Sequence, residues 1–226
     1  MKRLFLPLLF ATILPAVFSC SSSNIGGYRL NERDAATAIR QMLDIGARES
    51  VKGAFSKEAI MTTLFPESIK KTLQTIQQLG LTNEVDRFTT TLGTAAEQAA
   101  TNSIPIFSNA IGRMSISDAM RIIKSDGAAA TEYLRATAGT EVRTAIVPVM
   151  REALNEYKLL EQWEKIIKPA QAFTKDKVNL DLANLMAGMV SEAMFRKIEE
   201  KEKQIRADAA ARSTPLLKKV FSRKWD

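Results

Sequence analysis

The stretch LNERDAATAIRQMLDIGARESVKGAF, residues 30–55, shows the pattern that decides the fold. Apolar residues recur in it every three or four positions, which is the spacing of one face of an amphipathic helix. These residues are Ala35, Ala38, Ile39, Met42, Leu43, Ala47 and Val51. Asn31 precedes them, with Asp34 three residues later, and this arrangement is typical of a helix N-cap. The stretch therefore predicts a helix that begins after Asn31 and continues to Phe55.

The same helical spacing extends through most of the remaining chain. It predicts helices over residues 56–64, 66–79, 82–102, 105–114, 115–124, 127–137, 140–167, 180–210 and 216–221. Pro105 is expected to open a new helix, Gly139 to end one, and Pro148 to kink or divide the next. No segment shows the sustained alternation of β-branched residues that is typical of strands. The predicted fold class is therefore all-α, a single compact domain of about nine helices over residues 30–226.

Residues 1–19 have the features of an export signal. Lys2 and Arg3 form a basic start, and an apolar run follows from Leu4 to Phe18. A membrane-spanning helix needs about 20 apolar residues, so this run is too short to span a bilayer. Residues 1–19 are therefore predicted to be a signal peptide. The small, polar and glycine-containing residues that follow make 20–29 a predicted tether.

Cys20 is the only cysteine of the chain, so an exported form would have no second cysteine for a disulfide. The preceding residues, Val17-Phe18-Ser19, make the site resemble the lipobox of bacterial lipoproteins. That resemblance implies cleavage before Cys20 and acylation of its thiol and its amine, which would give a stable membrane anchor. Ser21 implies, by analogy with enteric bacteria, sorting to the outer membrane of the cell envelope, facing the periplasm. The alternative is an ordinary cleaved signal peptide with an incidental cysteine.

The composition excludes several kinds of chemistry. The chain has no histidine, which rules out Ser-His-Asp and Cys-His catalysis and every histidine-containing metal site. Acylation of Cys20 would also remove the only thiolate, so we expect neither a metal nor another cofactor. Without Lys2 and Arg3 the formal charge falls from +7 to +5, a modest surplus from which we predict no nucleic-acid partner.

Two glutamates are weak candidates for a catalytic general acid. Glu97 lies among alanines in GTAAEQAATNS, and close packing of those alanines would bury it and favour its protonated form. The alternative is an inward alanine face, with Glu97 in solvent beside Thr101. Glu132 lies in the small-residue stretch SDGAAATEYLRATAGT, residues 125–140, and would line a pocket if two helices met there.

Six further polar residues are candidates for ligand binding, namely Asp118, Thr131, Tyr133, Arg135, Arg206 and Arg212. Three of them belong to the small-residue stretch, where the alternative is close helix packing alone. Asp118 follows Ser115 by three residues, an arrangement typical of a capping box. For the two arginines near the C-terminus we favour buried or bidentate contacts that dock the tail over ligand binding.

The C-terminal stretch TPLLKKVFSRKWD, residues 214–226, combines basic and apolar residues. One interpretation is an amphipathic segment that lies on an anionic membrane surface. The other is docking of its apolar residues onto the helical domain, which the short length of the segment favours.

Three stretches resemble a family of bacterial exported proteins known only as domain of unknown function 4197. They are residues 30–55, AAEQAATNSIPIFSNAIGRMSISDAMRIIKSDGAAATEYLRATAG (residues 95–139) and IEEKEKQIRADAAARSTPLLKKVF (residues 198–221). Together they cover most of the chain from Leu30 to Phe221, in the order and at the spacing of the family. One departure is Gly93-Thr94, where the family usually has Asn-Arg. The resemblance implies a fold and a compartment but no chemistry.

These observations predict a membrane-anchored lipoprotein with a non-catalytic binding or scaffold domain for an envelope protein or an apolar ligand. One alternative is a carboxylate-dependent hydrolase of an envelope polymer, because a single-glutamate site needs no histidine. The other is a lipid-binding or membrane-surface protein that uses the basic C-terminal tail. Between these interpretations, an enzyme is the less favoured one.

Overall fold

The computed structural model describes residues 30–171 and 181–225, with the side chains of 166–171 left out. The predicted signal peptide 1–19, the predicted tether 20–29 and Cys20 lie outside these residues. Within them the chain forms nine α-helices and no strand, which confirms the all-α fold class. A single buried apolar cluster draws residues from almost every helix.

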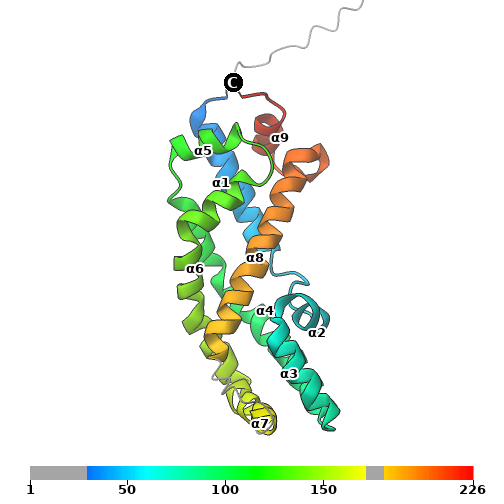
Figure 1. Ribbon diagram of the computed structural model, residues 1–226. Helices are drawn as coiled ribbons and strands as arrows, with labels where there is room; N and C mark the ends of the chain where they lie inside the picture. Colours follow the sequence, from blue (N-terminus) through cyan, green and yellow to red (C-terminus); the bar gives the residue numbers. More distant parts are fainter. Residues whose placement is uncertain (1–29, 172–180, 226) are drawn as a thin grey trace, which may run out of the picture.

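The elements follow one another as a bundle of long helices with shorter ones at both ends (Figure 1). Their bounds are α1 Glu32–Glu49, α2 Lys57–Ala59, the π-helical turn η1 Ile60–Leu64, α3 Glu67–Gln78, α4 Thr82–Gly112, α5 Ile116–Ile123, α6 Ala129–Glu156, α7 Leu159–Gln171, α8 Leu182–Ala207, the 3-10 turn η2 Ala209–Ala211 and α9 Pro215–Phe221. Helices α5 and α9 lie at one end of the bundle, and α3 and α7 lie at the other.

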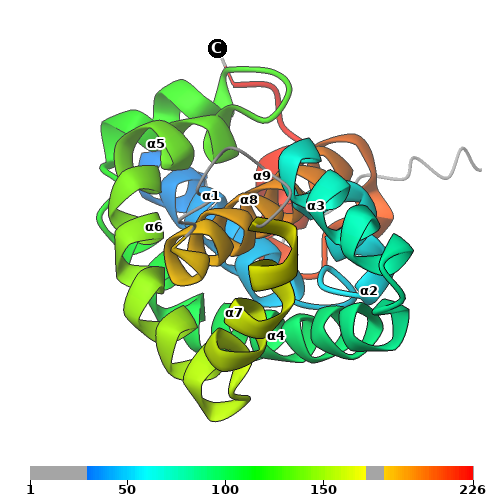
Figure 2. The same ribbon diagram turned by 60° about the horizontal axis from the view of Figure 1, so that its bottom comes forward.

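Helix α8 runs through the middle of the bundle. It packs against α1, α4, α6 and α9, and Figure 2 shows it surrounded by the other helices when the bundle is viewed from the α7 end. Its first five turns are mostly apolar and buried, including Met186, Val190 and Met194. Because α8 contacts so many elements, polar residues on its inner face can connect helices that are far apart in the sequence.

The N-terminal helix begins as its sequence predicts. The Asn31 side chain accepts the backbone N–H groups of Arg33 and Asp34, and the Asp34 carboxylate accepts the N–H of Asn31, which completes a capping box. The helix ends at Glu49 rather than at Phe55, because the chain turns through Gly53, which has a φ of +66°.

Helix α4 continues through Pro105, which corrects the predicted boundary between residues 102 and 105. Proline removes the hydrogen bond to the carbonyl of Thr101, but both residues are exposed, so water can satisfy that carbonyl. Ser103 and Phe107, on the opposite face, are fully buried. Tertiary packing of this buried face stabilises the helix across the proline.

Helix α6 likewise continues through Gly139, at which we predicted an end, and it is not divided at Pro148. Its buried positions Val142, Ile146 and Met150 pack in the core, and the helix contacts α4 and α8 along its length. The packed face therefore outweighs the low helix propensity of glycine and the missing N–H of proline. The chain breaks later, at Lys158, which has a φ of +53°.

Gly93 allows α4 to pass close to the chain that follows α1. A Cβ atom on Gly93 would lie 2.5 Å from the carbonyl oxygen of Phe55. A side chain at this position requires the backbone around Phe55 to move, so this close approach favours glycine.

Candidate functional site

Glu202, near the end of α8, is a fully buried carboxylate. It accepts the backbone N–H groups of Ala130 (2.9 Å) and Thr131 (2.7 Å) and the hydroxyl of Thr131 (2.7 Å). The two N–H groups belong to the first turn of α6, where amides have no partner within the helix. Ala128, the N-cap residue of α6, has no side chain to satisfy them. Glu202 therefore caps α6 from a distant part of the chain, and its charge favours that helix end.

Arg206, one turn after Glu202, connects the same carboxylate to α5. Its Nε donates to Glu202 at 2.9 Å, while its Nη1 donates to the carbonyl of Ser125 (3.0 Å) and its Nη2 to that of Ile122 (3.2 Å). Those carbonyls lie at the C-terminal end of α5. The Arg206 side chain is only 15 % exposed and packs over the ring of Phe221. Arg206 thus neutralises Glu202 and orients the turn between α5 and α6.

Arg212 fastens the C-terminal segment to the end of α8. It is buried, and it donates to the carbonyls of Ile205 (2.9 Å) and Arg206 (3.0 Å) and to the hydroxyl of Ser222 (3.2 Å). The apolar face of α9 reaches the core beside these contacts. The contacts of Arg212 and of Arg206 are thus structural, and they hold α9 against α8.

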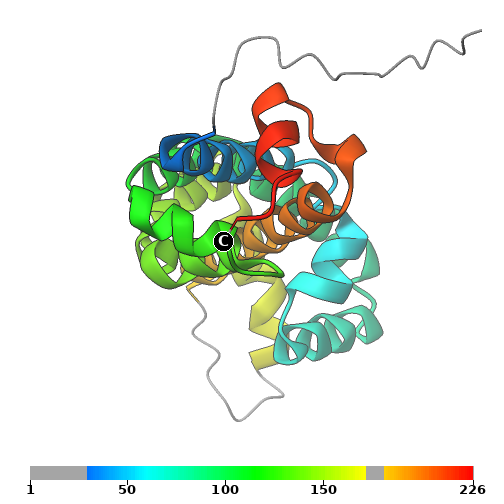
Figure 3. The same cartoon turned by 90° about the horizontal axis from the view of Figure 1, so that it is seen from above.

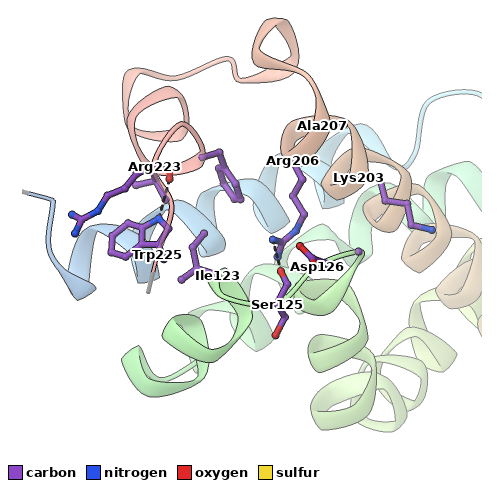
Figure 4. Close-up of a pocket in the computed structure, with 11 residues that line it drawn as sticks. Ile123, Ser125, Asp126, Lys203, Arg206, Ala207, Arg223 and Trp225 are labelled. Carbon is purple, nitrogen blue, oxygen red and sulfur yellow. Dashed lines mark hydrogen bonds between the residues drawn. The ribbon is translucent and has the colours of Figure 1, made fainter.

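These contacts frame a cavity of about 540 Å³ between the α5–α6 turn, α8 and α9 (Figure 4). Its apolar lining comes from Ile123, Val220, Phe221 and Trp225, and its charged lining comes from Asp126, Lys203, Arg206 and Arg223. In Figure 4 Arg206 reaches down to Ser125 between Lys203 on one side and Trp225 on the other. The cavity therefore joins an apolar aromatic wall to a predominantly cationic rim.

The wall formed by the C-terminal residues is held by two further hydrogen bonds. Trp225 donates its indole N–H to the carbonyl of Val220 at 3.0 Å. Arg223 lies over the Trp225 ring, 4.6 Å from its centroid, and donates to the carbonyl of Leu30 at 3.2 Å. The first described residue of the chain thus lies beside the cavity, as does the C-terminal segment.

Asp118 and Tyr133 meet outside this cavity, between α5 and α6. The Asp118 carboxylate accepts the hydroxyls of Ser115 (2.5 Å) and Tyr133 (2.8 Å) and pairs with Arg121. The hydrogen bonds from Ser115 and Tyr133 lower the pKa of Asp118. Burial and the hydrogen bond to Asp118 raise the pKa of Tyr133. Ser115 also caps α5, as its sequence predicts, so this cluster joins two helices.

Arg135 lies neither in the cavity nor in the Asp118–Tyr133 cluster. It lines a groove of about 480 Å³ between α6 and α8. It pairs with Glu192 and lies over the ring of Phe195, with 4.8 Å between the guanidinium carbon and the ring centroid. Arg143 lines the same groove. Arg135 therefore does not join the cavity of Figure 4.

Neither candidate general acid lies in a cavity described above. Glu97 is exposed on α4, where its carbonyl accepts the hydroxyl of Thr101. Glu132 is exposed in the first turn of α6, on the side of Lys203. The candidate residues are thus dispersed: Thr131 and Arg206 share Glu202, Arg212 donates to the Arg206 carbonyl, Asp118 and Tyr133 share a hydrogen bond, and Glu97, Glu132 and Arg135 lie apart from these groups.

Sequence reasoning missed Glu202 and the aromatic wall. Glu202 lies four residues after Ile198 and three before Ile205, so it occupies the apolar stripe of α8, and all three residues are fully buried. A charged residue in such a stripe, with Arg206 four residues later, was the available signal. Nothing local indicated that Trp225 folds back to Val220.

Two further searches concern the described residues alone. No three carboxylate, cysteine or histidine side chains in 30–165 and 181–225 are grouped so that they could hold a metal ion. Among the helices of the described chain, none has both the length and the apolarity required to cross a bilayer.

Residues 29–222 match the family model described as Protein of unknown function (DUF4197). Searches of the curated proteins and of the solved structures found no match.

Proposed function

Because this chain belongs to the DUF4197 family of proteins of unknown function, we propose from its site that it is a non-catalytic binding protein, anchored to the outer membrane through lipid on Cys20. The domain faces the periplasm, where its cavity receives an apolar ligand or an apolar segment of an envelope protein. The lipobox resemblance at Val17-Phe18-Ser19-Cys20 supports the anchor.

The observation that carries the binding function is the cavity between α5, α6, α8 and α9. Its frame is preorganised, because Glu202 and Arg206 satisfy the ends of two helices and so hold the α5–α6 turn in one position. Phe221 and Trp225 expose apolar surface to it. Concave apolar surface with a few fixed polar groups is typical of ligand sites.

A hydrolase has less support. A glutamate that acts as a general acid in glycan cleavage works inside a substrate cleft. Glu97 and Glu132 are both exposed, and neither lines the cavity. The cavity itself has one lining carboxylate, that of Asp126.

The anchor is tested by metabolic labelling with an alkyne fatty acid, followed by mass spectrometry of the N-terminal peptide. We expect label on Cys20 and an N-terminus that begins at this residue, and we expect Cys20→Ala to lose the label. Ser23→Ala is the matched control and should be labelled like the natural protein. An unlabelled protein cleaved elsewhere in the signal would contradict the lipid anchor.

The binding function is tested with 1-anilinonaphthalene-8-sulfonate, whose fused rings match the aromatic wall and whose sulfonate matches the cationic rim. We expect saturable fluorescence, and Trp225→Ala should weaken binding about tenfold through lost apolar contact. Leu79→Ala, at an exposed apolar residue of the α3 end, is the control. Equal binding by both variants would rule out this cavity as the site.

A further inference from the structure

Both ends of the described chain meet at one end of the bundle. Arg223 donates to the carbonyl of Leu30, and Figure 3 shows α9 beside the start of α1, with the α7 end behind. The cavity of Figure 4 opens at this same end, because Arg223 and Trp225 line it. An anchor on the chain before Leu30 would therefore hold the molecule at the end where the cavity opens.

The length of the preceding chain limits where this end lies in the anchored protein. Ten residue steps separate Cys20 from Leu30, and ten fully extended residues span at most about 35 Å. Helix α4 alone has 31 residues, which corresponds to about 46 Å. An anchor at Cys20 thus keeps the α5 and α9 end within reach of the bilayer, whereas α3 and α7 lie farther away.

The C-terminal segment at this end is cationic. Beyond the buried Arg212, residues 212–225 contain no acidic residue and four basic ones, namely Lys218, Lys219, Arg223 and Lys224. Lys218, Arg223 and Lys224 are exposed and have no ion pair with any described residue. Such a cluster is attracted to the anionic lipids of a membrane surface and is repelled by cationic ones.

The cavity adds a specific contact to this attraction. Trp225 is half-buried and joins an apolar ring to a polar N–H, the combination that suits membrane interfaces. Arg223 lies against its ring, whereas Lys203, at the other side of the cavity, is paired with Glu199 (Figure 4). A phosphate group on Arg223 would place the glycerol and acyl carbons against Trp225.

The geometry points to the headgroup of an anionic phospholipid as the ligand of this cavity, with the α5 and α9 end of the bundle docked on the membrane that holds Cys20. The inference rests on the lipid anchor of the proposed function. It assigns Arg223 to the phosphate and Trp225 to the apolar part of the lipid, and it orients the long axis of the bundle away from the bilayer.

The two tryptophans of the chain provide the test. Trp225 lies in the cavity, whereas Trp163 is buried on α7 at the far end. The acylated protein is reconstituted into vesicles with brominated acyl chains, made of phosphatidylcholine alone or mixed with phosphatidylglycerol. With Trp163→Phe, we expect bromine to quench Trp225 in the mixed vesicles and to leave it largely unquenched in phosphatidylcholine. With Trp225→Phe, the remaining Trp163 should stay unquenched in both.

Charge variants test the headgroup contact. Arg223→Glu with Lys224→Glu should abolish the phosphatidylglycerol-dependent quenching, and the matched reversal Lys71→Glu with Arg87→Glu, both exposed near the far end, should retain it. Lys218→Gln with Lys224→Gln is a milder second variant that should reduce the quenching. Circular dichroism identifies any variant that fails to fold.

Several outcomes would overturn the inference. Trp225 quenching that is equal in both vesicles, or unchanged in the charge variants, would exclude anionic headgroup binding. Soluble glycerol phosphate that relieves the Trp225 quenching at the same phosphate concentration as the lipid would assign the cavity to a free phosphate ester. Mass spectrometry of the N-terminal peptide of each preparation separates these results from a missing anchor, which would instead contradict the proposed function.

Discussion

At the scale of single residues, Glu202 and Arg206 decide how the cavity is framed. Burying two charges costs solvation free energy, and their mutual attraction alone does not always repay it. Here the Glu202 carboxylate accepts four hydrogen bonds, three from Ala130 and Thr131 and one from Arg206. Each of these donors is satisfied only when it lies next to the Glu202 carboxylate. The Glu202–Arg206 pair therefore stabilises one arrangement of α5, α6 and α8.

Replacing Glu202 should therefore destabilise the protein strongly. Glu202→Ala leaves the first amides of α6 unsatisfied and the Arg206 charge without its partner, and we expect a loss of about 3 kcal/mol in the free energy of unfolding. Urea unfolding followed by circular dichroism measures this loss. Glu200→Ala is the control, because Glu200 is an exposed partner of Lys197, and it should cost less than about 0.5 kcal/mol. Equal losses in the two variants would refute the capping role.

At the scale of elements, α5 depends on contacts at both of its ends. It has eight residues, too few for a helix that is stable in isolation. Ser115 caps its start, Arg206 donates hydrogen bonds to carbonyls at its end, and Asp118 connects it to Tyr133 on α6. Since α5 forms one side of the cavity, these polar contacts position the site as much as the apolar core does.

The contribution of Asp118 should depend on pH. Hydrogen bonds from Ser115 and Tyr133 lower its pKa in the folded state, so the unfolded chain takes up this proton at a higher pH. The stabilisation is then complete above the unfolded pKa of about 4 and is lost as the pH falls through the folded value. We expect urea midpoints between about pH 6 and pH 2 to fall less steeply for Asp118→Asn than for the natural protein. The urea midpoints of Tyr133→Phe should fall with an intermediate steepness. Asp126→Asn, in the adjoining turn, is the control. Parallel curves for Asp118→Asn and the natural protein would contradict the prediction.

At the scale of the whole molecule, the bundle has two unlike ends. One contains the first described residue, α9 and the cavity, and the other contains α3 and α7. A lipid on Cys20 would occupy the only natural thiol, so a cysteine introduced elsewhere is the sole target for a thiol reagent. This property makes the orientation at a membrane measurable.

We expect the two ends to react differently with a membrane-impermeant maleimide. In anchored protein, Lys218→Cys should react about fivefold more slowly on vesicles with phosphatidylglycerol than on phosphatidylcholine alone, because docking covers it. Lys71→Cys, on α3, should react at the same rate on both kinds of vesicle. The same ratio of rates at both positions would exclude an end-on orientation.

Much of the helical content could be predicted from local pattern. The spacing of apolar residues located the helices, and Asn31 and Ser115 marked helix starts that the structure confirms. Pro105 and Gly139 were misjudged because local propensity is small beside the packing of a long buried face. The resemblance to the family was confirmed by the match over residues 29–222.

The candidate site was less predictable than the helices. Thr131, Arg206 and Arg212 were singled out, but Thr131 and Arg206 have partners far away in the chain. Thr131 meets Glu202 across 71 positions of sequence, and Arg206 meets Ser125 across 81. Periodicity tells which face of a helix is buried and says nothing about which distant residue shares that interior.

The sequence by itself determined the all-α class and most helix positions, since these depend on neighbours within one or two helical turns. Only the tertiary structure decided that α4 and α6 remain continuous, that Glu202 caps α6, and that Trp225 closes a cavity beside Leu30. The physical reason is that each of these outcomes depends on burial, which removes water from groups that the folded chain alone brings together.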